Sequence, residues 1–145
     1  MLKEIHDDIW NWWSKGHYIA VSTNGFVKNN GACVMGRGIA EQAAERFERL
    51  PFELGVLIKQ FGNIPFVFET YSIITVPTKS NWWENSSLEL IEKSVSKLAK
   101  ATAPRYPICV PRLGCSNGKL DWKNVKPILE KYLDESRFLI VDLAV

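Results

Sequence analysis

The sequence predicts an α/β fold in which helices cover both faces of a mixed, mostly parallel sheet. Apolar periodicity, punctuated by glycine and proline, divides the chain into alternating strands and helices. No internal repeat or low-complexity linker interrupts this alternation. The length of 145 residues is close to that of one domain. We therefore expect a single domain over residues 1–145.

The expected strands are short runs of β-branched, aromatic and aliphatic residues bounded by turn formers. They cover residues 17–23, 65–69, 71–76, 107–111 and 138–145. The second and third runs follow one another closely in the chain, so we expect these two strands to pair.

The expected helices carry apolar residues at helical spacing. They cover residues 5–15, 39–50, 52–62 and 124–133, and a further helix follows Ser86 and buries Leu88, Ile91, Val95 and Leu98. Pro51 is expected to end the second helix. Ser86 and Glu89 have the spacing of a capping box, and Asp121 or Asn124 is expected to cap the last helix.

Composition and charge are those of an ordinary globular protein. The net charge of +2 and the pI near 8.4 are too weak for a protein that coats duplex DNA. The amino-terminal residues lack the basic and apolar regions of a signal peptide, and no uncharged apolar stretch is long enough to span a bilayer. We expect a cytoplasmic monomer with no membrane partner.

The residues that commonly bind metals do not form a metal-binding pattern. Cys33, Cys109 and Cys115 lack the paired C-x-x-C spacing of a zinc site and are odd in number. His6 and His17 have no Cys, Asp or His at ligand spacing. We expect reduced thiols, structural histidines, no metal and no cofactor.

Ligands of such sheets bind outside the carboxyl ends of the strands. Three predicted loops, residues 24–38, 77–84 and 112–121, leave strands at their carboxyl ends. These loops are therefore expected to converge on one site.

Two of these loops contain glycines arranged as in an anion site. Gly36 and Gly38 stand directly before a predicted helix, where unpaired N–H groups and the helix dipole favour phosphate. Gly114 and Gly118 bracket small polar residues, so the N–H groups of residues 114–118 can form an anion-binding nest. An ordinary turn needs the same glycines for geometry alone, but two facing loops of this kind suit a diphosphate.

Lys79 stands where a strand ends and two tryptophans, Trp82 and Trp83, begin. Beside bulky side chains and a phosphate site, its amine can lose hydration and acquire a lowered pKa, which makes it a nucleophile or an acid–base group. It can also neutralise phosphate as a point charge, or be a solvated loop lysine. Its position alone leaves these three roles open.

Several polar residues have a binding role and a structural role that compete. Asn24 and Asn30 can bond to sugar hydroxyls, although asparagine before glycine is also a common turn residue. Asp8 can accept from the exocyclic amine of a purine or cap the first helix. Arg37 and Arg112 stand beside the glycine loops, where they can bind phosphate or carry ordinary surface charge.

The aromatic amino-terminal segment has a similar ambiguity. Trp10, Trp12 and Trp13 can stack on bases. Six tryptophans in a domain of this size nevertheless reflect packing in the core and at its rim more often than ligand binding.

Three segments, in this order, resemble a macrodomain. They are "NG…VMGRGIA" from residue 24, "VPTKSNWW" from residue 76 and "VPRLGCSNGKLDWKNV" from residue 110. The resemblance runs through most of the chain. Within the family, the "PTK..W" and "LDW" segments resemble most the DNA ADP-ribosyl glycohydrolase antitoxins and, more distantly, the terminal ADP-ribose protein glycohydrolases.

The resemblance implies a three-layer α/β/α fold that binds ADP-ribose, with the diphosphate between the glycine loops and the adenine near the amino-terminal acidic residue. It implies that Lys79 is catalytic and attacks or stabilises the anomeric carbon of the distal ribose. The implied ligand-binding residues are Asp8, Asn24, Asn30, Val34, Met35, Gly36, Gly38, Ile39, Pro77, Thr78, Arg112, Leu113, Gly114, Cys115, Ser116, Asn117 and Gly118.

The chain departs from the family pattern in two places. The strand end "VSTNGFVKNNG" is several residues longer than usual, so the ribose-binding asparagine is Asn24 counted from the strand or Asn30 counted back from "MG"; we favour Asn24. Where the protein-directed enzymes have an acidic residue in the second loop, this chain has Gly118. The DNA-directed branch resembles this segment better.

The resemblance therefore implies hydrolysis of ADP-ribosyl groups from modified DNA bases or from acidic protein side chains. The implied partners are ADP-ribose, an ADP-ribosylated macromolecule and single-stranded DNA. Two alternatives remain: a non-catalytic ADP-ribose reader, and a hydrolase of ADP-ribose 1''-phosphate or O-acetyl-ADP-ribose.

Overall fold

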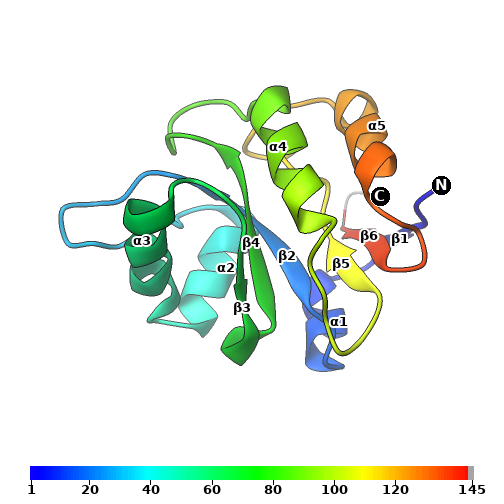
Figure 1. Ribbon diagram of the computed structural model, residues 1–145, viewed down its shortest axis with the longest axis horizontal. Coiled ribbons are helices and arrows are strands. Elements are labelled where there is room, and N and C mark those ends of the chain that lie inside the picture. Colours follow the sequence, from blue (N-terminus) through cyan, green and yellow to red (C-terminus); the bar gives the residue numbers. More distant parts are fainter. Residues whose placement is uncertain (144–145) are drawn as a thin grey trace.

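The computed structural model describes residues 1–143, which form one six-stranded sheet with helices on both of its faces (Figure 1). The strands are β1 (Glu4–His6), β2 (Ile19–Asn24), β3 (Phe66–Phe68), β4 (Ile73–Lys79), β5 (Ile108–Val110) and β6 (Phe138–Asp142). The helices are α1 (Ile9–Ser14), α2 (Gly38–Arg46), α3 (Leu50–Phe61), α4 (Leu88–Leu98) and α5 (Trp122–Tyr132), with a 3₁₀ turn at Glu69–Tyr71.

The strand order is β1-β6-β5-β2-β4-β3. All neighbouring strands are parallel except β3 and β4, which form the expected antiparallel pair. The predicted mixed, mostly parallel sheet is thereby confirmed. The strand expected at residues 138–145 ends at Asp142, and residues 144–145 of that prediction lie outside the described part of the chain.

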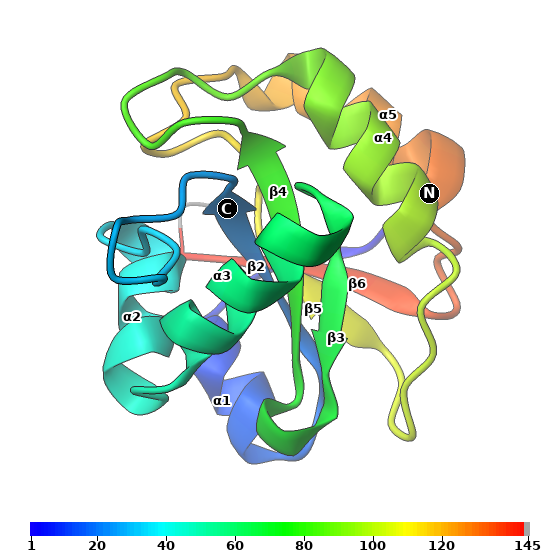
Figure 2. The ribbon, with the colours of Figure 1, turned by 60° about the vertical axis from the view of Figure 1, so that its left-hand side comes forward.

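Helices α4 and α5 lie on one face of the sheet, and α1, α2 and α3 lie on the other (Figures 1 and 2). Each face has its own apolar cluster. Alternate residues of a strand point to opposite faces, so Ala20 of β2 packs with α4 and α5, whereas Ile19 and Val21 pack with α1, α2 and α3. Burial on both faces explains why the central strands are almost continuously apolar, and it confirms the three-layer architecture.

The helix predicted at residues 5–15 is wrong at its start. Glu4–His6 instead form the edge strand β1, which pairs in parallel with β6 in the register Glu4 to Ile140. A three-residue strand of mixed polarity has no periodicity that sequence can report. The helix begins only at Ile9, after Asp8 accepts a hydrogen bond from the Trp10 N–H.

Pro51 begins a helix and does not end one. Helix α2 stops at Arg46, and Leu50 is already the first residue of α3. Proline fits the first helical turn because its missing N–H would have no partner there. The helix predicted over residues 39–50 therefore ends at Arg46, and the non-helical residues 47–49 separate it from α3.

The helix after β4 begins one residue later than the capping box predicts. Ser87, and not Ser86, is the N-cap, and its hydroxyl accepts from the Leu90 N–H at 3.2 Å. The predicted cap at Asp121 is confirmed, since its carboxylate accepts from the Lys123 N–H at 3.0 Å. Because Ser87 caps the helix, the buried Ser86 side chain is free to contact other parts of the fold.

No helix within residues 1–143 combines the length and apolar character that a membrane span requires.

Leu113 gives a test of the core. It is fully buried in the cluster under α4 and α5, so Leu113→Ala should lower the free energy of unfolding by about 2–5 kcal/mol, because it removes buried methyl groups and leaves a cavity. Chemical denaturation measures this change. Phe52→Ala on the exposed face of α3 is the control and should change it by no more than about 0.5 kcal/mol. Equal effects of the two substitutions would contradict the described packing.

Candidate functional site

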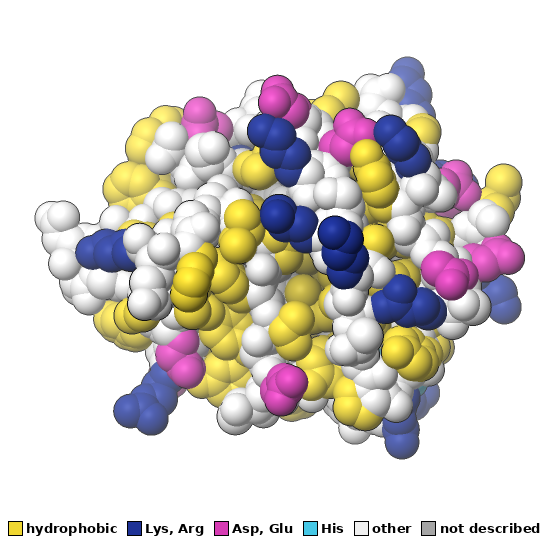
Figure 3. All heavy atoms as spheres, viewed as in Figure 1, with side chains coloured by type: hydrophobic (Ala, Val, Ile, Leu, Met, Phe, Trp, Pro, Cys, Tyr) yellow, Lys and Arg dark blue, Asp and Glu magenta, His cyan; other side chains and the backbone are white. Residues whose placement is uncertain are grey.

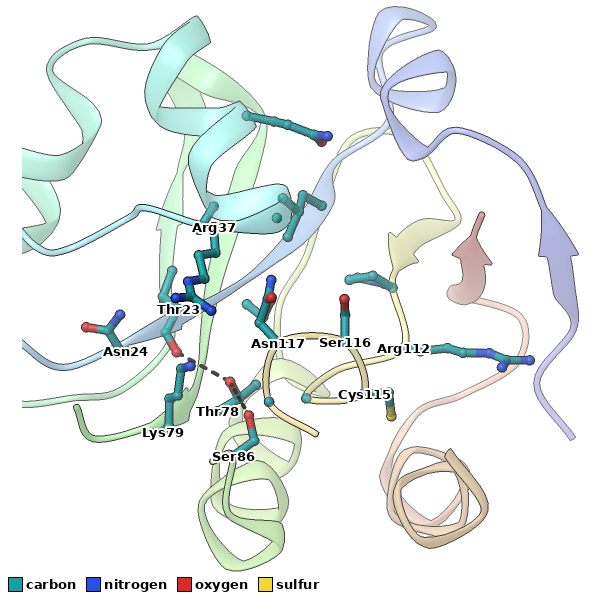
Figure 4. A pocket seen from close by; sticks show the side chains of 18 of the residues that line it. Thr23, Asn24, Arg37, Thr78, Lys79, Ser86, Arg112, Cys115, Ser116 and Asn117 are labelled. Carbon is teal, nitrogen blue, oxygen red and sulfur yellow. Dashed lines mark hydrogen bonds between the residues drawn. The ribbon is translucent and has the colours of Figure 1, made fainter. Parts of the chain in front are cut away.

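A cavity of about 1150 Å³ opens at the carboxyl ends of the central strands. As expected, the three loops that follow β2, β4 and β5 converge there (Figure 4). The turn between β1 and α1 and the end of β6 complete its wall with Asp7, Asp8, Val141, Asp142 and Leu143. A cavity of this volume is slightly larger than the usual range of about 300–1,000 Å³ for small-ligand sites.

Lys79 is the last residue of β4 and reaches the cavity through a β-bulge. Thr23 pairs with Pro77 but Asn24 pairs with Lys79, so Thr78 is an additional residue in β4. Pro77 cannot donate to a strand ladder, and a bulge re-aims the side chains that follow it. The Lys79 carbonyl accepts from the Asn63 side chain at 3.2 Å, which fixes the backbone from which the amine extends.

The Lys79 amine lies in a partly buried, electropositive environment. It donates to the Trp82 carbonyl at 3.1 Å. Burial lowers the pKa of Lys79, the Arg37 charge lowers it further, and Glu84 opposes both effects. Figure 4 shows the Lys79 and Arg37 side chains pointing toward one another across Thr23. Within residues 1–143 neither cation has an ion-pair partner, so the space between them favours an anion.

The loop before α2 presents unpaired backbone donors to the same space. The N-cap Arg37 makes no side-chain hydrogen bond to the helix, and the N–H groups of residues 36–40 donate to no backbone carbonyl within residues 1–143. Gly38 has a φ of 57°, which favours glycine, and the Asn117 side chain of the facing loop lies close above it. These donors and the helix dipole suit a phosphate.

The loop of residues 112–118 is folded tightly over Ser86. A Cβ at Gly118 would overlap the Ser86 hydroxyl and the Gly114 carbonyl. The backbone N–H of Cys115 donates to the Arg112 carbonyl. The N–H groups of Ser116, Asn117 and Gly118 reach no backbone carbonyl among the described residues. Of the predicted nest of residues 114–118, Cys115 is thus the member whose N–H is already used, and the adjacent N–H groups of residues 116–118 are open donors.

Hydrogen bonds through two hydroxyl groups connect the loop of residues 112–118 to β4, the strand that ends in Lys79, and to β2. Ser86 Oγ donates to Thr78 Oγ1 at 3.2 Å, and Thr78 Oγ1 donates to the Thr23 carbonyl at 3.5 Å (Figure 4). The Ser86 N–H donates to the Gly118 carbonyl at 3.0 Å. Sequence reasoning missed Ser86 as a site residue because the capping pattern explained it.

Both candidate asparagines form hydrogen bonds to the backbone of their own loop. The Asn24 amide donates to the Val34 carbonyl, and its oxygen accepts from the Phe26 N–H, each at 2.9 Å. In Figure 4 the Asn24 side chain points away from Asn117. Asn30 accepts from the Ala32 N–H at 3.0 Å and lies outside the cavity wall. Asn24 lines the cavity, so it remains the better placed of the two.

Asp8 and Arg112, the two charged residues expected near the ligand, already interact with other groups of the protein. Asp8 caps α1 and also lines the cavity, so both of its predicted roles are compatible. The Arg112 guanidinium points away from Lys79 toward β1 (Figure 4), lies over Trp122 with the guanidinium carbon 5.1 Å from the ring centre, and pairs with Glu4 at 3.5 Å. Its Nε is buried without a hydrogen bond within the described chain. This orientation does not support the hypothesis that Arg112 binds phosphate.

Most of the sequence-predicted residues lie together at the cavity. They are Asp8, Asn24, Val34, Met35, Gly36, Gly38, Ile39, Thr78, Lys79, Arg112, Gly114, Cys115, Ser116, Asn117 and Gly118. Asn30, Pro77 and Leu113 are not part of the wall: Asn30 is in the outer loop, Pro77 is inside β4 and Leu113 is in the core. Phe26, Lys28, Trp82 and Ser86 line the cavity without having been predicted to.

Cys33 and Cys115 are not reactive thiolates, and Trp10 is not free to stack on a base. Burial raises the pKa of Cys115 to about 11 and that of Cys33 to about 12, so neither is a thiolate at neutral pH. Trp10 is buried, and its indole donates to Gln42 at 2.7 Å. Within residues 1–143 no cluster of His, Cys, Asp or Glu could hold a metal ion.

Comparisons with known proteins identify the fold. No protein-family model matches the sequence, and no curated protein sequence matches it. The macrodomain of Mycobacterium tuberculosis DarG matches in structure with a TM-score of 0.77, 25% identity and coverage of 97% of each chain. The chain has the macrodomain fold.

Two further structures show the same fold. The macrodomain of Thermus aquaticus DarG matches with a TM-score of 0.74 and 24% identity, covering 98% of this chain and 97% of that chain. Thermosipho africanus DarTG in complex with ADP-ribose matches with a TM-score of 0.68 and 24% identity. This match covers 87% of the chain and only 38% of the DarTG chain. The predicted resemblance to macrodomains is confirmed, with DarG proteins among the matched structures.

The contact between Gly118 and Ser86 gives a second test. Gly118→Ala should destabilise the protein by about 1–3 kcal/mol, because the added Cβ forces the loop away from Ser86. Gly36→Ala is the matched control in the facing loop, since a Cβ there meets nothing within 4 Å. Thermal and chemical denaturation should separate the two variants, and a fully stable Gly118→Ala protein would refute the tight packing of this loop.

Proposed function

We propose that this macrodomain binds ADP-ribose and hydrolyses ADP-ribosyl groups from a modified macromolecule through Lys79. The observation that carries the proposal is the partly buried amine of Lys79, which faces Arg37 at one end of a cavity that already has two loops of open N–H donors. The fold shared with Thermosipho africanus DarTG, solved in complex with ADP-ribose, supports the choice of ligand.

The diphosphate binds between the two glycine loops in this proposal. The N–H groups of residues 36–40 and of residues 116–118 approach it from opposite sides, and Asn117 lies close to Gly38 where the loops meet. The adenine then extends toward Asp8 and the end of β6, and the distal ribose extends toward Lys79 and Asn24.

Lys79 acts as the nucleophile in the proposed reaction. The lone pair of its neutral amine forms a bond to the anomeric carbon of the distal ribose, while the bond to the base nitrogen or carboxylate oxygen breaks and its electrons leave with that group. The Lys79 nitrogen then loses a proton to the leaving group or to water. Its lone pair forms a C=N bond to the anomeric carbon as the bond from that carbon to the ring oxygen breaks, and the ring oxygen takes a proton from water, so the sugar ring opens. Water then cleaves the adduct, which releases ADP-ribose and restores the amine.

The environment of Lys79 supports this role over that of a simple point charge. A lowered pKa increases the fraction of neutral amine at a given pH, and only the neutral amine is a nucleophile. Position 118 is glycine, so the carboxylate that the protein-directed enzymes have there is missing, and the proposed mechanism assigns the attack to the amine.

Substitution of Lys79 tests the proposal. Lys79→Ala and Lys79→Arg should each reduce the release of ADP-ribose from ADP-ribosylated single-stranded DNA or protein by about 100-fold or more, while both still bind ADP-ribose. Lys79→Arg keeps the charge but lacks a nucleophilic amine. Lys93→Ala on the surface of α4 is the control and should behave as the wild type.

The outcomes separate the candidate functions. Full activity of Lys79→Arg would show that a positive charge at this position suffices for catalysis, and it would overturn the proposal that Lys79 is the nucleophile. Binding of ADP-ribose by the wild type without turnover of any substrate would favour a reader. Phosphate or acetate release from ADP-ribose 1''-phosphate or O-acetyl-ADP-ribose that survives Lys79→Ala would favour the metabolite hydrolase.

The pH dependence tests the state of the amine. Activity should rise with pH through the pKa of Lys79, because deprotonation creates the nucleophile. Arg37→Gln removes a charge that lowers this pKa, so the rising limb should move to higher pH, whereas Arg37→Lys should leave it near the wild-type position. Rate profiles at saturating substrate measure the shift, and a limb that moves to lower pH in Arg37→Gln would contradict the electrostatic account.

A further inference from the structure

Three aromatic side chains from two different loops meet at the mouth of the cavity. The rings of Phe26 and Trp83 have centres 5.4 Å apart at 69°, and those of Trp82 and Trp83 are 5.5 Å apart at 90°. Trp82 is 45% exposed and Trp83 is 60% exposed. These rings are outside both apolar clusters of the core, so packing within the fold does not account for their exposed faces.

The aromatic group is continuous with the proposed catalytic centre. Phe26 and Trp82 line the cavity, and the Lys79 amine donates to the Trp82 carbonyl at 3.1 Å. A group attached to the carbon that Lys79 attacks therefore leaves next to these rings. In Figure 1 the loops that carry them protrude at the same side of the molecule, and Figure 3 shows hydrophobic side chains at the surface where the loop after β4 lies.

Hydrogen bonds within the fold join the two loops. The Gly25 N–H donates to the Ser80 carbonyl at 3.0 Å, and the Asn63 side chain, which packs against Gly25, donates to the Lys79 carbonyl at 3.2 Å. These contacts place Phe26 beside Trp83. A preformed aromatic surface loses little conformational entropy when it binds a flat ligand.

The charges around the aromatic group are mostly positive. Lys28, Arg37 and Lys79 line the same cavity, while the nearby Glu84 carboxylate accepts from the Asn81 N–H at 2.7 Å. Exposed aromatic faces beside cations are the arrangement that binds single-stranded nucleic acid, in which bases stack and phosphates are neutralised. An acidic protein side chain would use the cations but would leave the ring faces without a partner.

We infer that Phe26, Trp82 and Trp83 form a binding site for an unpaired nucleobase of a single-stranded nucleic acid. This inference rests on the proposed function, because it assigns the leaving group of that reaction to a base that stacks on these rings as its bond to the ribose breaks. The site selects single strands because the bases of a duplex have no free face to offer.

Strand binding tests this site without requiring catalysis. The probes are unmodified single-stranded DNA and RNA oligonucleotides, the corresponding DNA duplex and an acidic peptide of equal charge, each measured by fluorescence anisotropy at one fixed salt concentration. Trp83→Ala should weaken binding of the single strands about 10-fold, and Trp83→Phe should keep most of the affinity. Phe52→Ala, an exposed aromatic on α3, is the control and should match the wild type.

The readouts distinguish this inference from the proposed function. Trp83→Ala should leave the affinity for ADP-ribose unchanged by calorimetry, and on an ADP-ribosylated oligonucleotide it should raise KM about 10-fold with little change in kcat. Equal loss for single strand, duplex and peptide, or no loss at all in Trp83→Ala, would overturn the nucleobase site. A wild-type protein that binds the strands but not ADP-ribose would overturn the proposed function and leave the nucleobase site standing. A preference for DNA over RNA, or the reverse, supports the site and identifies the sugar that it accepts.

Discussion

The contact between Ser86 and Gly118 determines the geometry of the whole site. Ser86 follows the β4 loop, yet its N–H and hydroxyl reach Gly118 and Thr78, so one buried residue connects the anion-binding loop to the strand that ends in Lys79. The contact requires a glycine at 118, since a Cβ would occupy the position of the Ser86 hydroxyl. These hydrogen bonds connect the loop of residues 112–118 to β4, which holds the anion site near the amine, and catalysis benefits from such preorganisation.

The electrostatics of the cavity follow from what the fold leaves unpaired. Helix α2 begins without a side-chain cap, and Arg37 and Lys79 face one another with no ion-pair partner in the described chain. Two like charges near a helix amino terminus repel each other, and a diphosphate between them would relieve that repulsion. In contrast, the carboxylate of Glu4 near the other end of the cavity is fully engaged by Trp122, Arg112 and Lys126. The charge of Glu4 is therefore balanced within the fold, whereas the positive charges of Arg37 and Lys79 face the ligand space.

Sequence patterns were sufficient for the layers, for the strands β2 to β6 and for the convergence of the loops, because those follow from apolar periodicity and from the parallel connections. They were insufficient where a single residue has two plausible uses. Pro51 fits both the end of one helix and the first turn of the next, and the break at Phe47 leaves no signal in composition. Ser86 and Ser87 are equivalent as caps until the loop at Gly118 excludes one of them. Strand β1 exists only through its pairing with β6, a contact between the two ends of the chain.

In the site, too, some features could be predicted from the sequence and others could not. Lys79 and the glycine loops were predictable because strand ends and glycine spacing have direct physical meaning, but the direction of Arg112 toward Glu4 and Trp122 depends on tertiary packing alone.

The central claim is that the Lys79 amine bonds to the distal ribose. Reduction with cyanoborohydride during turnover of an ADP-ribosylated oligonucleotide, followed by peptide mass spectrometry, tests it most directly. The account predicts a stable ADP-ribose adduct on Lys79 and none on Lys28, the other lysine in the cavity wall. Turnover without an adduct on Lys79, or adducts spread evenly over exposed lysines, would contradict it.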